Sequence, residues 1–161
     1  MMFRIILLIF SLISPLAQAQ GCHITPGWQA MSSGEVKLEK AGQTFFLPIR
    51  IADNPSKRAA GYQWICEADT NNTAVLFEFS EMVPGAFHMR NVYVPLDIYF
   101  FDDSGKQIDA MVMRPEPPGQ GIKPRYYQPV AAFRYALEIA RPQTHDLKSK
   151  PTPMRLLIDS L

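Results

Sequence analysis

The sequence lacks the short motifs that mark the best-known catalytic and metal sites. It has only three histidines and two cysteines, and neither a C-x-x-C nor an H-E-x-x-H pattern occurs, so the usual zinc sites find no support. A G-x-S-x-G serine elbow, a phosphate-cradling glycine loop and a dinucleotide fingerprint are also missing. The enzyme classes that depend on these motifs are therefore not indicated.

The chain has no excess of charge of one sign. It contains 16 Lys and Arg residues and 15 Asp and Glu residues, and loss of Arg4 with the N-terminal segment would leave 15 of each. Nucleic-acid binding depends on clustered basic residues that neutralise phosphates, and attachment to anionic lipids needs a polybasic patch. The balance argues against both and favours a neutral ligand or a protein partner.

Long hydrophobic runs are scarce, and the longest lies at the N-terminus. Arg4 precedes the apolar run Ile5 to Ile13, and Pro15 and Ala17-Gln18-Ala19 follow it. The run is well short of the roughly 20 residues of a membrane-spanning helix, but a positive start, an apolar centre and small residues before a cleavage point are typical of a secretory signal peptide. We therefore expect residues 1–19 to be removed and the remaining 142 (161 − 19) to act in the periplasm or outside the cell. An uncleaved anchor is the alternative.

The two cysteines, Cys22 and Cys66, both belong to the exported part. An even number of cysteines in an oxidising compartment favours a disulfide, which we predict between these two residues. Ala19-Gln20-Gly21 also resembles a poor lipoprotein signal, which would make Cys22 an acylated first residue. Two unpaired thiols are the third possibility.

Thirteen of the 14 prolines lie after residue 19, which argues against long helices. We predict a mainly β fold (α+β with one short helix), organised as a compact antiparallel β barrel or sandwich, with no transmembrane segment after cleavage. Residues 20–46 would form a lead-in and a first hairpin, and residues 47–161 a single β-rich domain. The helix should start at Pro55, capped by Asp53 or Asn54. The expected strands are 36–38, 44–51, 74–79, 87–92, 96–101, 107–113, 134–140 and 155–158, although 134–140 also allows a helical turn.

Several segments resemble a known family in order along the chain. Phe87-His88-Met89-Arg90-Asn91-Val92 and Pro95-Leu96-Asp97-Ile98, with Tyr99-Phe100-Phe101-Asp102, resemble the F-W-M-K-N-T-x-x-P-L-D-I-x-F-I-D signature of domain of unknown function 192. Arg58 and Gly61 fit its A-x-T-x-x-x-R-x-x-G-L-M helix, and the segments Val75-Leu76-Phe77, Met113-Arg114-Pro115 and Tyr135-Ala136-Leu137-Glu138 fit three further motifs.

The resemblance covers about residues 47–140. It implies a compact β-rich fold with one short helix, usually exported and without an assigned activity. The sequence departs from the family pattern at His88, where Trp is usual, at Arg90, where Lys is usual, and at Tyr62-Gln63, which replace Leu-Met.

The polar residues of the signature suggest a binding site. Arg90, Asn91 and Asp97 would lie at a pocket mouth, and Tyr126 or Tyr127 would cover it from the proline-rich segment 115–129. The competing interpretation is structural: Asn91 would bond turn backbone, and Asp97 would pair with Arg90. The tyrosines would then simply pack the loop onto the domain.

Metal binding and catalysis receive weaker support. His88 with Met89, Met111 and Met113 could bind copper, although methionine is also an ordinary core residue and no cofactor is expected overall. Asp97 with Glu138 or His88 could form a hydrolase site of two carboxylates, whereas Glu138 could instead point outward from an edge strand. We expect a non-catalytic envelope domain that binds a small neutral ligand, a glycan or a protein partner.

Overall fold

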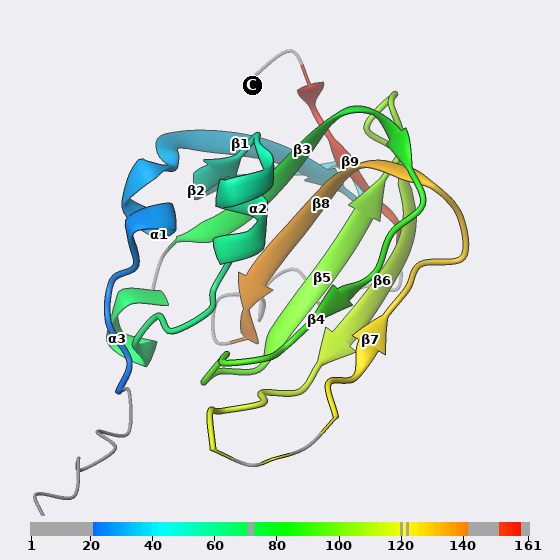
Figure 1. Ribbon diagram of the computed structural model, residues 1–161. Coiled ribbons are helices and arrows are strands. Elements are labelled where there is room, and N and C mark those ends of the chain that lie inside the picture. The colour runs from blue at the N-terminus through cyan, green and yellow to red at the C-terminus, as the bar shows by residue number, and fades with distance from the viewer. Residues whose placement is uncertain (1–20, 71–72, 120, 122, 142–151, 159–161) are drawn as a thin grey trace, which may run out of the picture.

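The computed structural model of the protein describes residues 21–70, 73–119, 121, 123–141 and 152–158 (Figure 1). The predicted signal peptide, residues 1–19, lies outside this part of the chain. Of the residues that carry the lipoprotein pattern before Cys22, only Gly21 lies within it. Within the described residues, no helix combines the length and the apolar composition that a membrane crossing requires.

Strands dominate the fold, as predicted. The main sheet has seven strands in the order β6-β5-β8-β3-β2-β1-β9, and a second sheet pairs β4 with β7. Their bounds are β1 Ser32–Lys40, β2 Gln43–Ala52, β3 Ala74–Val83, β4 Phe87–His88, β5 Leu96–Phe101, β6 Gln107–Met113, β7 Tyr126–Tyr127, β8 Phe133–Ala140 and β9 Met154–Leu156. The mainly β, sandwich-like class is confirmed. The expectation of a wholly antiparallel sheet is wrong, because β2 and β3 run parallel.

The first hairpin forms where the sequence predicts it. Ala41 and Gly42 connect β1 to β2, and both have positive φ angles, 53° and 76°. Two residues with positive φ form a tight turn whose twist matches that of the flanking strands, so the two strands pair directly on either side of it. Both strands of the hairpin belong to the main sheet. Strand β2 therefore crosses the boundary at residues 46 and 47 that was expected between the lead-in and the β-rich domain.

In the described part of the chain, three short helices accompany the sheet instead of the single helix that was expected. They are α1 Pro26–Ala30, α2 Pro55–Ala60 and α3 Glu67–Thr70. The predicted helix is α2: the Asn54 side chain accepts a hydrogen bond from Lys57 N, and Pro55 occupies its first turn. Helix α1 has the same design, with Thr25 as its cap and Pro26 in its first turn. Figure 1 shows α1 and α2 together beside the sheet.

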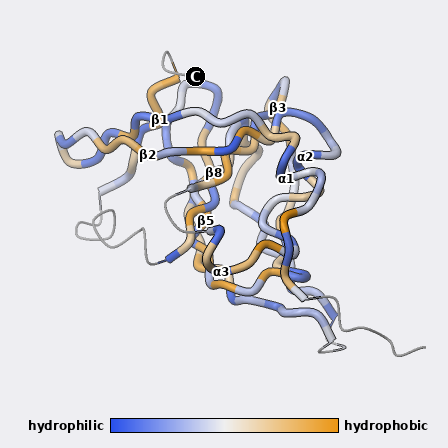
Figure 2. Tube along the Cα trace, turned by 90° about the vertical axis from the view of Figure 1, so that its left-hand side faces the viewer, coloured by the Kyte–Doolittle hydropathy of each residue, from blue (hydrophilic) through white to orange (hydrophobic). Residues whose placement is uncertain are grey.

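Two hydrophobic clusters fill the fold. Cluster 1 lies between one face of the sheet and the segments that cover it, and includes Trp28, Tyr62, Met89, Phe100 and Phe133. The buried residues of cluster 2 all come from strands of the main sheet, so the sheet curls around them. Figure 2 shows hydrophobic and hydrophilic residues mixed along β5 and β8, the strands that separate the two clusters.

The segment 87–92 is not the continuous strand that its sequence suggested. Only Phe87 and His88 pair as a strand, with Tyr127 and Tyr126 of β7. Beyond them, the chain makes single bridges to Glu116, one from Arg90 and one from Val92. The proline-rich segment 115–129 is thus partly anchored, because β7 and Glu116 hold it against this signature region.

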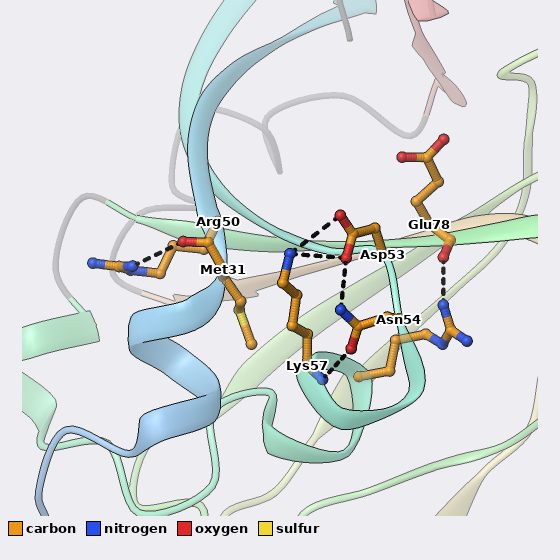
Figure 3. A network of polar contacts seen from close by, with 7 residues as sticks. Met31, Arg50, Asp53, Asn54, Lys57 and Glu78 are labelled. Carbon is orange, nitrogen blue, oxygen red and sulfur yellow. Dashed lines mark hydrogen bonds and ion pairs between the residues drawn. The ribbon is translucent and has the colours of Figure 1, made fainter.

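The N-terminal part of the described chain is tied down at two places. Cys22 and Cys66 form the predicted disulfide, with Cα atoms 4.8 Å apart, so the alternative of an acylated or free Cys22 is not supported. Arg50 of β2 packs its guanidinium 4.9 Å from the centre of the Trp28 ring and donates a hydrogen bond to the Trp28 carbonyl. Figure 3 shows Arg50 beside Met31, whose carbonyl it also contacts.

Candidate functional site

A cavity of about 360 Å³ opens between α2, the segment after α2, and strands β3, β4 and β8. This volume falls within the range of roughly 300–1,000 Å³ that is usual for small-molecule sites. Its walls are mainly apolar and aromatic, with a few polar groups. The lining comprises Arg58, Ala59, Ala60, Gly61, Tyr62, Gln63, Phe77, Phe79, Val83, Pro84, Gly85, Ala86, Phe87, His88, Val92, Phe133 and Glu138.

Four phenylalanines make one wall of the cavity. The ring of Phe87 meets that of Phe77 edge-on at 4.9 Å between centroids, and Phe79 meets Phe133 in the same way at 5.3 Å. Phe87 and Phe133 are also 5.9 Å apart. Such edge-to-face contacts hold each ring against its neighbours, so this wall exists before any ligand arrives.

Glu138 is the only acidic residue in the lining, and it is buried, with 4% of its surface exposed. It lies in the middle of β8, opposite Val75 of β3 and Ile98 of β5. Residues that pair directly across strands share a face, so Glu138 occupies a position that two apolar neighbours mark as core. The expectation of an outward residue on an edge strand is therefore wrong.

Burial raises the pKa of Glu138 from 4.5 to about 8. No residue in the described part of the chain donates a hydrogen bond to its carboxyl group. The carboxyl group lines the cavity instead. Near pH 7 the side chain is mostly the neutral acid, which can both donate and accept a hydrogen bond toward the cavity.

Gly61 keeps space open in front of this carboxyl group. It ends α2 with a φ of 44°, and its N–H donates to the carbonyl of Lys57. A Cβ atom at this position would lie 3.3 Å from the Phe77 ring and 3.8 Å from Oε2 of Glu138. Any larger side chain would enter the cavity next to Glu138. The glycine therefore serves the backbone turn and the cavity at once.

Tyr62 follows directly and forms part of the floor. It is buried, and its hydroxyl donates a hydrogen bond to the Thr73 carbonyl, 2.6 Å away. Burial, followed by the nearby charge of Glu138, raises its pKa well above the usual value. Tyr62 therefore keeps its proton throughout the physiological range.

Arg58 brings a positive charge to the same cavity from α2. Its guanidinium lies 4.7 Å from the centre of the Phe79 ring, and its Nη1 donates a hydrogen bond to the Glu78 carbonyl at 2.9 Å. The Glu78 end of this contact is visible in Figure 3, which also shows Lys57 paired with Asp53 at the start of α2. A guanidinium has five N–H groups, so Arg58 retains donors for a ligand.

His88 and Gln63 complete the polar lining. His88 Nδ1 accepts a hydrogen bond from the backbone N–H of Arg90, which leaves the proton of the neutral ring on Nε2 as a donor. The Gln63 amide is engaged at both ends: its Nε2 donates to the Ala59 carbonyl, and its Oε1 accepts from Asn91 Nδ2.

The predicted cluster of Arg90, Asn91 and Asp97 does not form at this cavity. Arg90 and Asn91 line a smaller hollow of about 190 Å³ with Glu116 and the prolines that follow it. Asn91 has a φ of 60°, its N–H donates to the Glu116 carbonyl, and its own carbonyl accepts from Trp64 N. Asn91 thus joins two loops through its backbone, while its side chain bonds Gln63 rather than the turn backbone that the structural interpretation required.

Asp97 lies on the other face of the sheet. It pairs with Ile139 while Glu138 pairs with Ile98, so the side chains of Asp97 and Glu138 point to opposite sides. Asp97 Oδ1 is 3.4 Å from Nε of Arg141, not near Arg90 as the structural interpretation required. The two carboxyl groups therefore do not face a common cleft, as the predicted hydrolase site of Asp97 with Glu138 required. His88, the other predicted partner of Asp97, lines the same cavity as Glu138.

The two tyrosines of β7 have different environments. Tyr127 is 8% exposed, belongs to cluster 1, and its hydroxyl accepts a hydrogen bond from Arg114 N. Tyr126 is 61% exposed and meets the His88 ring edge-on at 6.2 Å. Only Tyr126 is therefore placed to contact something outside the protein, next to a residue of the cavity rim.

The methionines of the copper hypothesis belong to the core. Met113 and Met89 are fully buried in cluster 1, and Met111 packs against it. Met113 pairs with Leu96 and Met111 with Ile98, as ordinary core residues of neighbouring strands do. Within the described part of the chain, no three His, Cys, Asp or Glu side chains are arranged to hold a metal ion.

The sequence analysis named Glu138 as a possible hydrolase residue or an outward edge residue, and missed its buried position at the cavity. A signal for it exists in the stretch Tyr-Ala-Leu-Glu-Ile-Ala, residues 135–140, where both alternating faces are otherwise apolar. A strand that is apolar on both faces is a central strand. A single acid in such a strand is then a buried acid, which is a candidate functional residue.

The sequence comparison identifies the family. The profile of DUF192, described as an uncharacterized ACR, matches residues 36–152. The chain belongs to the DUF192 family. The match extends further toward both ends than the signature motifs did, and it includes every strand from most of β1 to β8. No curated protein matches the chain.

Two solved structures of bacterial proteins share the fold. One is a proposed transcription regulator from Sinorhizobium meliloti, with 24% sequence identity and a TM-score of 0.67 over 81% of this chain and 97% of that one. The other is a protein of unknown function from Novosphingobium aromaticivorans, with 17% identity and a TM-score of 0.61 over 85% of this chain and 99% of that one. At these identities the likeness establishes the DUF192 fold alone.

Proposed function

We propose that this DUF192 protein is an exported binding protein that holds a small neutral organic molecule in the cavity above Glu138, without transforming it. The observation that carries the proposal is a preformed aromatic cavity with a buried carboxyl group at its base. A core position of this kind is normally apolar, and Gly61 leaves the carboxyl group accessible.

Export is part of this proposal. The N-terminal pattern of Arg4, an apolar run and Ala17-Gln18-Ala19 supports cleavage and secretion. The Cys22–Cys66 disulfide agrees with it, since such bonds persist in oxidising compartments. The balanced charge gives no support for a role on DNA, although one protein of the same fold is described as a transcription regulator.

Binding of N-phenyl-1-naphthylamine, an uncharged probe that fluoresces in apolar surroundings, tests the cavity. Ala86 lines the cavity and is exposed, so Ala86→Trp should fill the opening and strongly reduce probe fluorescence. Ala110 is exposed on β6 outside the cavity, and Ala110→Trp is the matched control. Equal probe binding by both variants and the unchanged protein, or none by any of them, would refute the proposed function.

A further inference from the structure

The polar groups of the cavity restrict the kind of molecule that it can hold. At neutral pH three of them have hydrogen-bond donors to offer: the acid O–H of Glu138, the remaining N–H groups of Arg58 and Nε2–H of His88. The Tyr62 proton and one amide N–H of Gln63 are already used within the protein, and the Gln63 amide oxygen accepts from Asn91. The cavity therefore presents mainly donors from an apolar aromatic wall.

A ligand with a positive charge, or one without any polar group, fits this arrangement poorly. An ammonium group would meet the Arg58 guanidinium in the same cavity, and it would find Glu138 mostly uncharged. A pure hydrocarbon would fill the space but would leave the buried Glu138 O–H without an acceptor. Buried donors without an acceptor cost about 1–3 kcal/mol, so an acceptor on the ligand adds affinity.

We propose that the cavity recognises an uncharged, mainly apolar compound through a carbonyl oxygen, which accepts a hydrogen bond from the carboxyl group of Glu138. The aromatic rings of Phe77, Phe79, Phe87 and Phe133 provide the apolar contacts, and the Arg58 guanidinium lies over the Phe79 ring. This inference rests on the proposed function, because it names the chemical class of the ligand for the same cavity.

Three compounds of the same shape separate the possibilities: 4-phenylbutan-2-one carries a carbonyl, butylbenzene carries no polar group, and 3-phenylpropylamine carries a positive charge. Each competes with N-phenyl-1-naphthylamine for the cavity at pH 7. The ketone should compete about five- to tenfold better than butylbenzene, the gain of one net hydrogen bond in a buried site. The amine should be the weakest of the three.

Changes at Glu138 identify the group responsible. Glu138→Gln keeps a donor of similar shape and should retain the preference for the ketone. Glu138→Leu removes the donor and should abolish the advantage of the ketone over butylbenzene. The leucine variant should fold well, because the neighbouring positions Val75 and Ile98 are apolar.

The pH dependence provides an independent check. The charged or titratable residues of the cavity are Arg58 on α2, Tyr62 after it and His88 on β4, and the partners of Glu138 on β3 and β5 are Val75 and Ile98. Burial holds the pKa of Tyr62 well above its usual value, so Tyr62 stays neutral between pH 7 and 9.5. Affinity for the ketone should therefore fall about tenfold across pH 8 in the unchanged protein and stay level in Glu138→Gln.

The outcomes distinguish this inference from the proposed function. If the amine competes best, or if all three compounds compete equally, the cavity is a binding site but the carbonyl preference is refuted. The same holds if the ketone is preferred but Glu138→Leu leaves that preference intact. If neither the probe nor any of the three compounds binds, the proposed function itself fails.

Discussion

Asp97 and Glu138 lie on neighbouring strands, one residue out of register, and their carboxyl groups point to opposite faces of the sheet. Both are buried, but their surroundings differ. Asp97 has the Arg141 guanidinium close by, whereas Glu138 is surrounded by the apolar walls of the cavity and has no cation as a direct partner among the described residues. The two acids should therefore respond differently to pH and to mutation.

Stability should fall as the pH rises, because of Glu138. Its pKa is about 8 in the folded protein and about 4.5 when exposed, so the folded state binds the extra proton between these values. A group of this kind stabilises least above its folded pKa, and the loss begins above pH 4.5. By pH 8 the loss relative to pH 4 is on the order of 4–5 kcal/mol.

Chemical denaturation from pH 4 to pH 9 measures this effect. The comparison is with Glu138→Gln, in which the same curve should lack this decline while all other titrating groups are unchanged. Parallel curves for the two proteins would show that Glu138 ionises normally and would remove the argument for a buried neutral acid.

Asp97→Ala should destabilise the protein more than His88→Ala. Asp97 is buried beside Arg141, and removing a buried partner leaves other groups unpaired at about 1–3 kcal/mol. His88 is half-buried at the cavity rim, where water can replace its contacts. The difference should appear in the denaturant midpoints of the two variants at pH 7, and identical midpoints would contradict it.

The Cys22–Cys66 bond should be present in protein recovered from an oxidising compartment. Its intact mass should be two hydrogens below that of the reduced form, with no free thiol. The bond spans 44 residues, so the double variant Cys22→Ser with Cys66→Ser should lose about 4 kcal/mol in the chain-entropy model. Two reactive thiols, or an acyl group on Cys22, would disprove the bond.

The two tyrosines of β7 should separate into a structural and a surface role. Tyr127→Ala removes a buried ring and the acceptor for Arg114 N, so a loss of about 3–5 kcal/mol is expected. Tyr126→Ala should change the melting temperature little, since the ring is 61% exposed. If Tyr126 covers the cavity beside His88, the same variant should also weaken binding of N-phenyl-1-naphthylamine. Unchanged binding would leave Tyr126 without a role as a lid.

Much of the fold could be predicted from local sequence patterns. The first hairpin and the Asn54-Pro55 helix start are short-range signals, and each formed where it was expected. The parallel pairing of β2 and β3 could not be predicted in this way. It depends on which strands meet after α2 and α3 have carried the chain back along the sheet, and no local pattern records that choice.

The candidate site was harder to predict for a related reason. Arg90, Asn91 and Asp97 are close in the sequence, and polar residues near a turn suggested a shared pocket. A difference of one residue in strand register sends Asp97 to the other face, and the positive φ of Asn91 turns the chain away. Glu138 is fifty residues from His88 and eighty from Arg58 in the sequence, so only the folded chain brings these three to one cavity.

The corner where the sheet edges meet has a consequence for the order of folding. The backbones of Lys106 and Arg155 form an isolated β-bridge, and Leu156 N donates a hydrogen bond to the Gly105 carbonyl. A Cβ atom at Gly105 would lie only 2.0 Å from the Leu156 carbonyl oxygen, so only glycine fits there. Met154 and Leu156 also complete cluster 2. A chain emerging from its N-terminus can thus assemble β1 to β8 early but leaves this cluster unsealed, with strand edges open to aggregation, until the last strand docks against Gly105.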